Sequence, residues 1–214
     1  QSGDFEIYVG ESNDIFRRTR QHYDAASDKL KWQNKLLQKD ARLFIIGHEH
    51  FNKSLTLDIE NRLMHYMMSV ECVKHVYNLR DNPQTSYYPM EEFDEIFRKI
   101  WRGLRKENKE LFPTESVIKD SAIYKASPLH KLTKEQEKAR ELIIQKVSDA
   151  LENGETKQLI FIDGEAGTGK TVLNSSTFYE LYCQAEENNK EIKCHLLVNH
   201  DEQITVYEQI AEKL

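Results

Sequence analysis

The sequence predicts an α/β protein in two parts: a small mixed sheet flanked by helices, then the first strand–helix units of a parallel sheet. Two observations predict this class. Short apolar runs rich in β-formers alternate with longer segments whose apolar residues recur at helical spacing. A glycine-rich stretch near the C-terminal third lies between an apolar strand and a helix, as in parallel α/β folds. The expected parts are a domain at 1–110, a linker at 111–130 and a second domain at 131–214.

The first part is expected to begin with a strand at 5–9 and a helix from about Asp14 to Ala26, with caps offered by Ser12 and Asn13. The elements expected next are a helix at 28–38, a buried strand at 42–46, a helix at 57–75 capped by Thr56, turns at 78–86 and a helix at 89–109. The mixed sheet is expected to have three strands. Residues 112–128 lack clear periodicity and contain two prolines, so they predict a linker.

The second part repeats strand and helix in alternation, which predicts a parallel sheet. The expected elements are helix 133–152, strand 158–162, helix 170–187, strand 193–198 and helix 201–213. Thr133 is the expected N-cap of the first of these helices, and Asn153-Gly154 its end.

Composition sets wide limits on function. The 214 residues are 39% hydrophobic and 31% charged, which is typical of a folded domain rather than a disordered chain. The formal net charge of −6 argues against a wholly basic nucleic-acid binder, although Lys and Arg cluster at 17–20 and again at 98–109. No apolar run approaches the roughly 20 residues of a membrane span, so no membrane partner is expected. Three separated cysteines fit free thiols in the cytoplasm.

A phosphate-binding loop is the most specific motif. It matches GxxxxGK[ST] at every position and comprises Gly164, Glu165, Ala166, Gly167, Thr168, Gly169, Lys170 and Thr171. Glycines allow the backbone amides to turn toward a phosphate, and the following helix directs its N-terminus at the same point. Lys170 is then expected to reach the terminal phosphates, and Thr171 to ligate Mg²⁺. The second part is therefore expected to bind a nucleoside triphosphate.

Leu132-Thr133-Lys134-Glu135-Gln136 precedes this loop and its strand. The segment resembles the Q motif of superfamily 1 helicases, which implies that Gln136 contacts adenine and that the nucleotide is ATP. The same residues also form a capping box, in which Thr133 and Gln136 exchange hydrogen bonds, so a purely local role stays open. No second acidic strand end follows, so we expect a fragment of a longer protein with an incomplete NTPase half.

A tyrosine, an arginine and a histidine are the candidate site of the first part. Tyr8 ends the expected strand, and Arg18 and His22 lie four residues apart on one face of the helix that follows. This stretch resembles the Y-[IV]-G and R-x-x-x-H elements of GIY-YIG nucleases. The resemblance covers roughly residues 5–85 and implies a catalytic role for Tyr8, Arg18 and His22. It further implies Glu60 as the carboxylate that holds Mg²⁺ or Mn²⁺, and Asn78 as the later family asparagine.

Taken together, the two resemblances imply a metal-dependent endonuclease acting on nucleic acid, with DNA favoured over RNA, joined to a Schlafen-like, ATP-binding, helicase-type domain. The family's first tyrosine element has no counterpart ahead of Tyr8. This departure keeps a second hypothesis open, a nucleotide-regulated nucleic-acid binding module whose nuclease half is inactive. A purely structural interaction domain would leave both motif sets unexplained.

Overall fold

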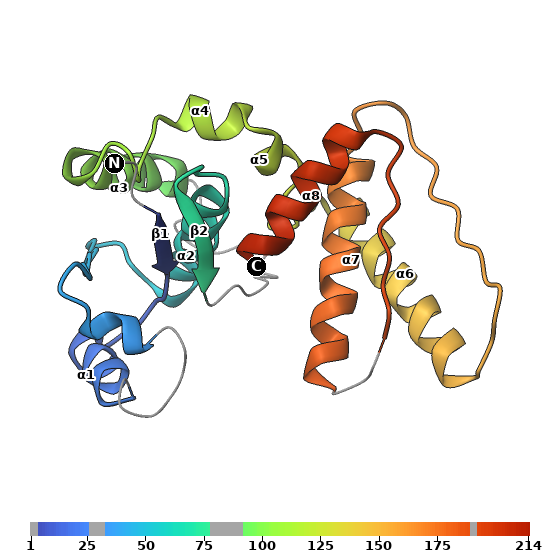
Figure 1. Cartoon of the computed structure of the whole chain (residues 1–214), viewed down its shortest axis with the longest axis horizontal. Helices are drawn as coiled ribbons and strands as arrows, with labels where there is room; N and C mark the ends of the chain where they lie inside the picture. Colours follow the sequence, from blue (N-terminus) through green and yellow to red (C-terminus); the bar gives the residue numbers. More distant parts are fainter. Residues whose placement is uncertain (1–3, 26–32, 78–91, 189–191) are drawn as a thin grey trace. The chain divides into compact units, whose positions relative to one another are not determined.

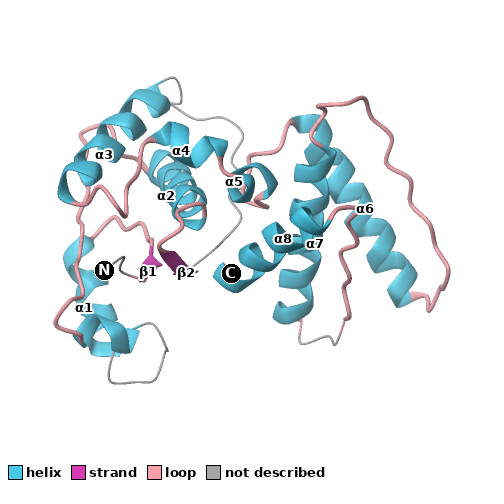
Figure 2. Cartoon of the chain, turned by 45° about the horizontal axis from the view of Figure 1, so that its top comes forward, coloured by secondary structure: helices cyan, strands magenta, loops and turns pink. Residues whose placement is uncertain are grey.

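The computed structural model describes residues 4–25, 33–77, 92–188 and 192–214. It is a mixed α/β protein, mostly helical, with one small parallel sheet (Figures 1 and 2). The chain divides into two compact units. The first runs through Ile118 and includes Glu212–Leu214, and the second spans Lys119–Ala211.

The elements of the first unit, in chain order, are β1 (Phe5–Tyr8), α1 (Ile15–Ala25), a 3₁₀ helix η1 (Gln33–Leu37), α2 (Lys53–Met68), β2 (Val73–Tyr77), α3 (Phe93–Glu107) and α4 (Glu115–Asp120), whose last two residues the second unit includes. Those of the second unit are α5 (Ala122–Ala126), α6 (Lys134–Glu152), α7 (Lys170–Glu187) and α8 (Asp201–Lys213), whose last residues the first unit includes. Of the helix expected at 28–38, the described part is η1, and residues 28–32 lie outside the described residues.

The two strands form a parallel pair in which Tyr8 is the register partner of Tyr77. Val73 and Val76 are fully buried, which fits the preference of β-branched side chains for a packed pleated surface. The expectation that residues 73–75 continue a helix is therefore wrong. Ser69 ends α2 by donating its backbone amide to Tyr66 and Met67, and the chain turns into β2 after it.

Helix α2 begins four residues earlier than expected, because Asn52 rather than Thr56 is its N-cap. The Asn52 side chain accepts a hydrogen bond of 3.0 Å from the Leu55 amide. The Thr56 hydroxyl instead donates back to the carbonyls of Asn52 and Lys53. Asn and Thr are both common N-cap residues, so the spacing of the sequence alone does not show which of the two begins the helix.

The core of the first unit is an aromatic cluster between α2 and α3. Trp101 is 2% exposed, stacks on Phe97 and meets Tyr66 edge-on. Its indole nitrogen donates to the Pro113 carbonyl at 2.8 Å. Phe112 also meets Trp101, so the chain after α3 folds back onto the same core.

Residues 111–130, expected as a linker, carry the short helices α4 and α5. Several of their side chains are buried: Leu111, Phe112, Ile118, Ala126, Ser127 and Leu129. The apolar residues of this segment show no regular spacing, because each of its helices is only one or two turns long and too short for a periodic pattern.

The strand expected at 42–46 does not form. Leu43 and Ile45 are 57% and 63% exposed, and Phe44 packs against Phe112 at 5.7 Å between ring centres. The sheet of the described residues has two strands, not three. An apolar run becomes a strand only when another strand offers its backbone groups, and neither β1 nor β2 pairs with this one.

The second unit packs α6 against α7. The runs at 158–162 and 193–198, expected as parallel strands, have no regular secondary structure and form no ladder with described residues. Leu159, Phe161 and Leu197 are 73%, 85% and 91% exposed. The parallel sheet expected here is thus not formed, since its two candidate strands do not pair with each other. No helix within the described ranges is long and apolar enough to cross a membrane.

Candidate functional site

The phosphate-binding loop of the second unit takes the backbone conformation that its glycines predict. Gly167 and Gly169 have φ angles of +84° and +82°, a region that side chains with a Cβ rarely adopt. Gly169 is the N-cap of α7, so the helix begins at Lys170. The free N-terminal amides of this 18-residue helix, and the positive end of its dipole, therefore lie at the end of the motif.

Hydrogen bonds within the loop involve the side chains of Lys170 and Thr168. The Lys170 ammonium donates to the carbonyls of Gly164 and Glu165 at 2.6 and 2.8 Å. The Thr168 hydroxyl donates to the Glu165 carbonyl at 2.8 Å. The lysine stem is long and flexible, so the ammonium group can change its hydrogen-bond partners without a change in the helix. Thr171 is exposed in the first turn of α7.

Gln136 connects helix α6 to the phosphate-binding loop. The capping box is confirmed: its Oε1 accepts from the Thr133 amide at 2.9 Å, and its own amide donates to the Thr133 hydroxyl. Its Nε2 donates to the Thr168 carbonyl at 2.9 Å, and a Cβ added at Gly169 would lie 2.4 Å from that nitrogen. A side-chain amide has two hydrogens and two lone pairs on its oxygen. One of each stays available for the edge of a base.

In the first unit, the structure brings together Tyr8, Arg18 and His22. An Arg18 Nη donates to the Tyr8 hydroxyl at 3.2 Å, and the rings of Tyr8 and His22 meet edge-on at 5.2 Å. Gly10 gives the phenol its room, because a Cβ there would lie 2.7 Å from the Tyr8 hydroxyl. The short strand, the turn and the first helix therefore place three polar side chains at one end of the sheet.

Burial lowers the pKa of His22 below its ordinary value, and the positive charge of Arg18 lowers the pKa further. Both effects favour the neutral imidazole at pH 7. A neutral imidazole can accept a proton, which is what a general base requires.

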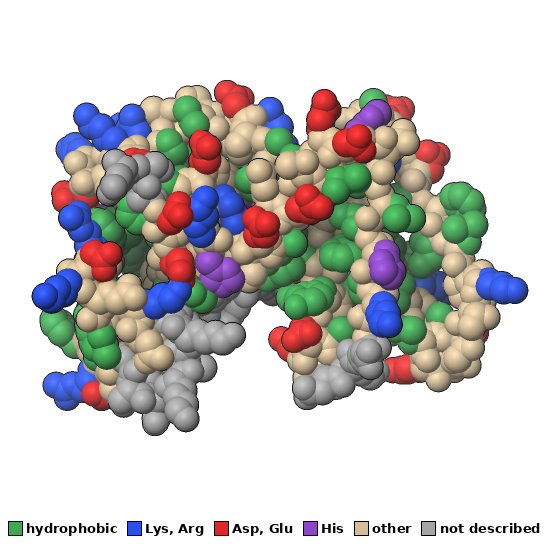
Figure 3. All heavy atoms as spheres, viewed as in Figure 1, with side chains coloured by type: hydrophobic (Ala, Val, Ile, Leu, Met, Phe, Trp, Pro, Cys, Tyr) green, Lys and Arg blue, Asp and Glu red, His purple; other side chains and the backbone are tan. Residues whose placement is uncertain are grey.

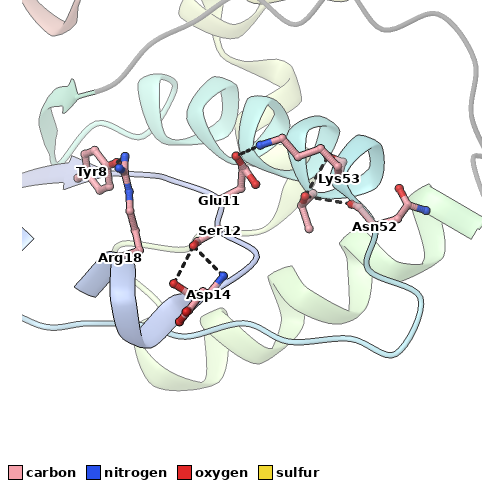
Figure 4. A network of polar contacts seen from close by, with 8 residues as sticks. Tyr8, Glu11, Ser12, Asp14, Arg18, Asn52 and Lys53 are labelled. Atoms are coloured by element: carbon pink, nitrogen blue, oxygen red, sulfur yellow. Dashed lines mark hydrogen bonds and ion pairs between the residues drawn. The ribbon is translucent and has the colours of Figure 1, made fainter. Parts of the chain in front are cut away.

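A polar hollow of about 330 Å³ lies beside Arg18. Arg17, Lys53 and Glu11 also line it, together with Ser12, Asn13 and Gln21. Glu11 follows β1, Lys53 opens α2, and their side chains point toward one another and form an ion pair (Figure 4). The second Glu11 oxygen is buried and has no hydrogen-bond partner within the part of the chain that the structure describes. Three cations against one carboxylate make the hollow suited to an anion.

The other two residues implied by the nuclease resemblance lie elsewhere. Glu60 is half-buried in the second turn of α2 and does not line this hollow. Asn78 lies outside the described residues. In the described ranges, no group of three or more His, Cys, Asp or Glu side chains could hold a metal ion.

Three residues beside Tyr8 escaped sequence reasoning. Tyr77 donates its hydroxyl to Glu6 at 2.6 Å, and Lys35 of η1 forms an ion pair with Glu6. Lys35 and Tyr77 lower the pKa of Glu6 through these hydrogen bonds, while burial and Glu6 raise the pKa of Tyr77. The alternation of 5–9 places Glu6 and Tyr8 on one face, but residues 73–75 of β2, the strand that ends at Tyr77, were expected to continue a helix.

The loop and the helix after it define the class of site in the second unit, a P-loop of the kind that binds nucleoside triphosphates. The family described as Schlafen group 3, DNA/RNA helicase domain, matches residues 157–214. This C-terminal part is thus similar to a helicase domain, which indicates a nucleic-acid-related NTPase function. No curated protein and no solved structure matches the chain. The nuclease resemblance of residues 5–85 has no counterpart in these comparisons.

Proposed function

We propose that this chain forms part of a nucleic-acid-processing enzyme whose C-terminal half binds ATP at residues 164–171. The observation that carries the proposal is the loop itself, with two glycines at positive φ leading into α7 at Lys170. The helicase-domain match across the same residues supports nucleic acid as the polymer on which the enzyme acts. Gln136 supports adenine as the base, since its amide borders the loop and keeps free hydrogen-bonding capacity.

Nucleotide binding tests this proposal directly. A fluorescent ATP analogue with Mg²⁺ is expected to bind the wild-type chain and to lose at least about tenfold in affinity with Lys170→Ala, because a charge-assisted contact to the phosphates is lost. Lys146→Ala on the exposed surface of α6 is the matched control and should bind as the wild type does. Equal binding by wild type and Lys170→Ala would refute the proposal.

A second candidate function, phosphodiester cleavage by the N-terminal half, is favoured by the cluster of Tyr8, Arg18 and His22. Cleavage develops negative charge on the phosphoryl oxygens, and the Arg18 guanidinium offers fixed donors for that charge. Neutral His22 lies against the Tyr8 ring and can act as base for a water or for the phenol. The adjoining cationic hollow would hold a neighbouring phosphate of the same strand.

The resemblance to GIY-YIG nucleases assigns the metal to Glu60. Mg²⁺ keeps several waters and is often held by one or two carboxylates, so a single half-buried glutamate is compatible with it. Glu11 is a second candidate ligand for the ion. Its carboxylate has a buried oxygen without a hydrogen-bond partner among the described residues, and it lies closer along the chain to Tyr8 than Glu60 does. Either ion site would supply a Lewis acid for the phosphoryl oxygens.

Plasmid DNA and single-stranded RNA incubated with Mg²⁺, Mn²⁺ or EDTA test the nuclease. We expect metal-dependent cleavage that Glu60→Gln and Arg18→Gln abolish, whereas Glu71→Gln, on the exposed turn after α2, leaves it unchanged. Cleavage lost in Glu11→Gln but retained in Glu60→Gln would move the metal to Glu11. Binding without cleavage under every condition would favour the alternative, a nucleotide-regulated binding module with an inactive nuclease half.

A further inference from the structure

Helix α3 carries a row of cations that neither the nucleotide site nor the Tyr8 site uses. Arg98, Arg102 and Lys106 recur every four residues and are exposed, so they form one continuous edge of the helix. The row spans roughly 12 Å of helix axis. Figure 3 shows Lys and Arg side chains gathered at the upper left, where Figure 1 draws α3.

Within the described ranges, no carboxylate forms an ion pair with any of these three side chains. Two other cations of the same helix already have partners. Lys99 pairs with Glu95 at 2.8 Å, and Arg105 donates to the Phe112 carbonyl at 2.9 Å.

Helix stability does not explain the row. A cation in the last turn favours the helix dipole, which covers Lys106 but not Arg98 or Arg102 in the middle of the helix. Like charges four residues apart disfavour a helix by about 0.2–0.5 kcal/mol per pair. The row of like charges therefore lowers the stability of the protein when no ligand is bound. A bound polyanion would turn this repulsion into a net attraction.

The buried face of α3 indicates which kind of polyanion can bind its exposed edge. The apolar residues Ile96, Phe97, Trp101 and Leu104 lie in the core of the first unit, each at most 8% exposed. A membrane-bound amphipathic helix needs its apolar face to enter the lipid, so a bilayer does not fit α3. A duplex presents about one phosphate per 1.7 Å, hence roughly seven along the length of this row.

We propose that the exposed edge of α3, formed by Arg98, Arg102 and Lys106, binds the phosphate backbone of a nucleic acid. This inference rests on the proposed function for the nature of the partner and adds the surface that holds it. The contacts are to phosphates alone, so binding is independent of base sequence and weakens with salt.

The test is the affinity of the full chain for a 30-base-pair duplex and a 30-nucleotide single strand at several salt concentrations. The variant is Arg98→Gln/Arg102→Gln/Lys106→Gln. Lys134→Gln/Lys138→Gln/Lys146→Gln on α6 removes the same charge from exposed lysines, two of which lie beside Glu135. Glutamine keeps good helix propensity, and thermal unfolding checks that both variants remain folded.

We expect the α3 variant to lose at least about tenfold in affinity near 0.1 M salt and to lower the salt slope by about two to three, with little change in the α6 control. Equal losses in the two variants would overturn the inference while leaving the proposed nucleic-acid function standing. A wild-type chain that binds no nucleic acid would overturn both. Binding only to vesicles rich in anionic lipid would replace the partner with a membrane surface.

Discussion

Glu11 and Lys53 control the charge of the hollow beside Arg18. Their ion pair, between the segment after β1 and the start of α2, neutralises both charges (Figure 4). Arg17 and Arg18 are then the cations of the hollow that can bind an anion. Sequence reasoning found Tyr8, Arg18 and His22 because the three lie within one strand and one turn-separated helix. It missed Lys53 because that residue reaches the hollow through the fold, 42 residues from Glu11.

Substituting the two partners should change nucleic-acid affinity in opposite directions. Glu11→Gln removes the competing carboxylate and should tighten the binding of a short single strand. Lys53→Gln removes a cation and should weaken it by about five- to tenfold at 0.1 M salt. Lys74→Gln, which breaks the exposed ion pair with Asp4, is the control. Fluorescence anisotropy measures all three, and a weaker Glu11→Gln complex would contradict this account of the hollow.

At the scale of single elements, the long helices α6 and α7 and the strand β1 were predictable, whereas the strands expected at 42–46, 158–162 and 193–198 do not form. The capping box of α6 and the glycine N-cap of α7 are local signals, so both helices were expected within a residue of their observed starts. The runs at 42–46 and 158–162 have equally strong apolar patterns but no strand partner among the residues that the structure describes. Pairing is a property of distant segments, which no short window of sequence contains.

The capping box gives a prediction for α6. Thr133→Ala should lower the free energy of unfolding by about 1 kcal/mol, since the Gln136 amide loses its acceptor. Thr133→Ser should restore most of it, because the hydroxyl is retained. Because Gln136 also holds the Thr168 carbonyl, Thr133→Ala should weaken nucleotide binding more than its stability loss alone would explain. Denaturant unfolding and nucleotide titration measure the two effects. An unchanged free energy of unfolding in Thr133→Ala would show that the capping box does not stabilise the protein.

For the whole molecule, stability should depend on pH through half-buried histidines. His130 is half-buried in the second unit, where its Nε2 hydrogen-bonds the Tyr124 carbonyl at 2.6 Å. Burial is the main influence on its pKa and lowers it. The unfolded chain therefore binds this proton more readily than the folded chain. The contribution to stability is fully present above about pH 6.5 and is lost as the pH falls through the folded-state pKa.

Thermal unfolding between pH 8 and pH 5 tests this linkage. The wild type should lose more Tm on acidification than His130→Gln, whose amide can still donate to the Tyr124 carbonyl but takes up no proton. His22 acts in the same direction, so the difference between the two curves isolates His130. Parallel curves would contradict the assignment.

The division into two compact units is also a property of the whole chain. The expected boundary fell on residues 111–130 because prolines and weak periodicity favour a linker there. The two units divide after Ile118, within this segment, and Leu111, Phe112 and Ile118 are buried. A segment of short helices carries too little periodic signal for sequence reasoning to separate it from a loop.

The central claim is that residues 164–171 bind the phosphates of a nucleoside triphosphate. Amide hydrogen exchange of the full chain, with and without ATP and Mg²⁺, tests it at the site. The account predicts slower exchange in peptides that cover 164–171 and the first turn of α7, and no such protection in Lys170→Ala. Unchanged exchange across 164–171 at saturating nucleotide, or protection confined to other segments, would contradict it.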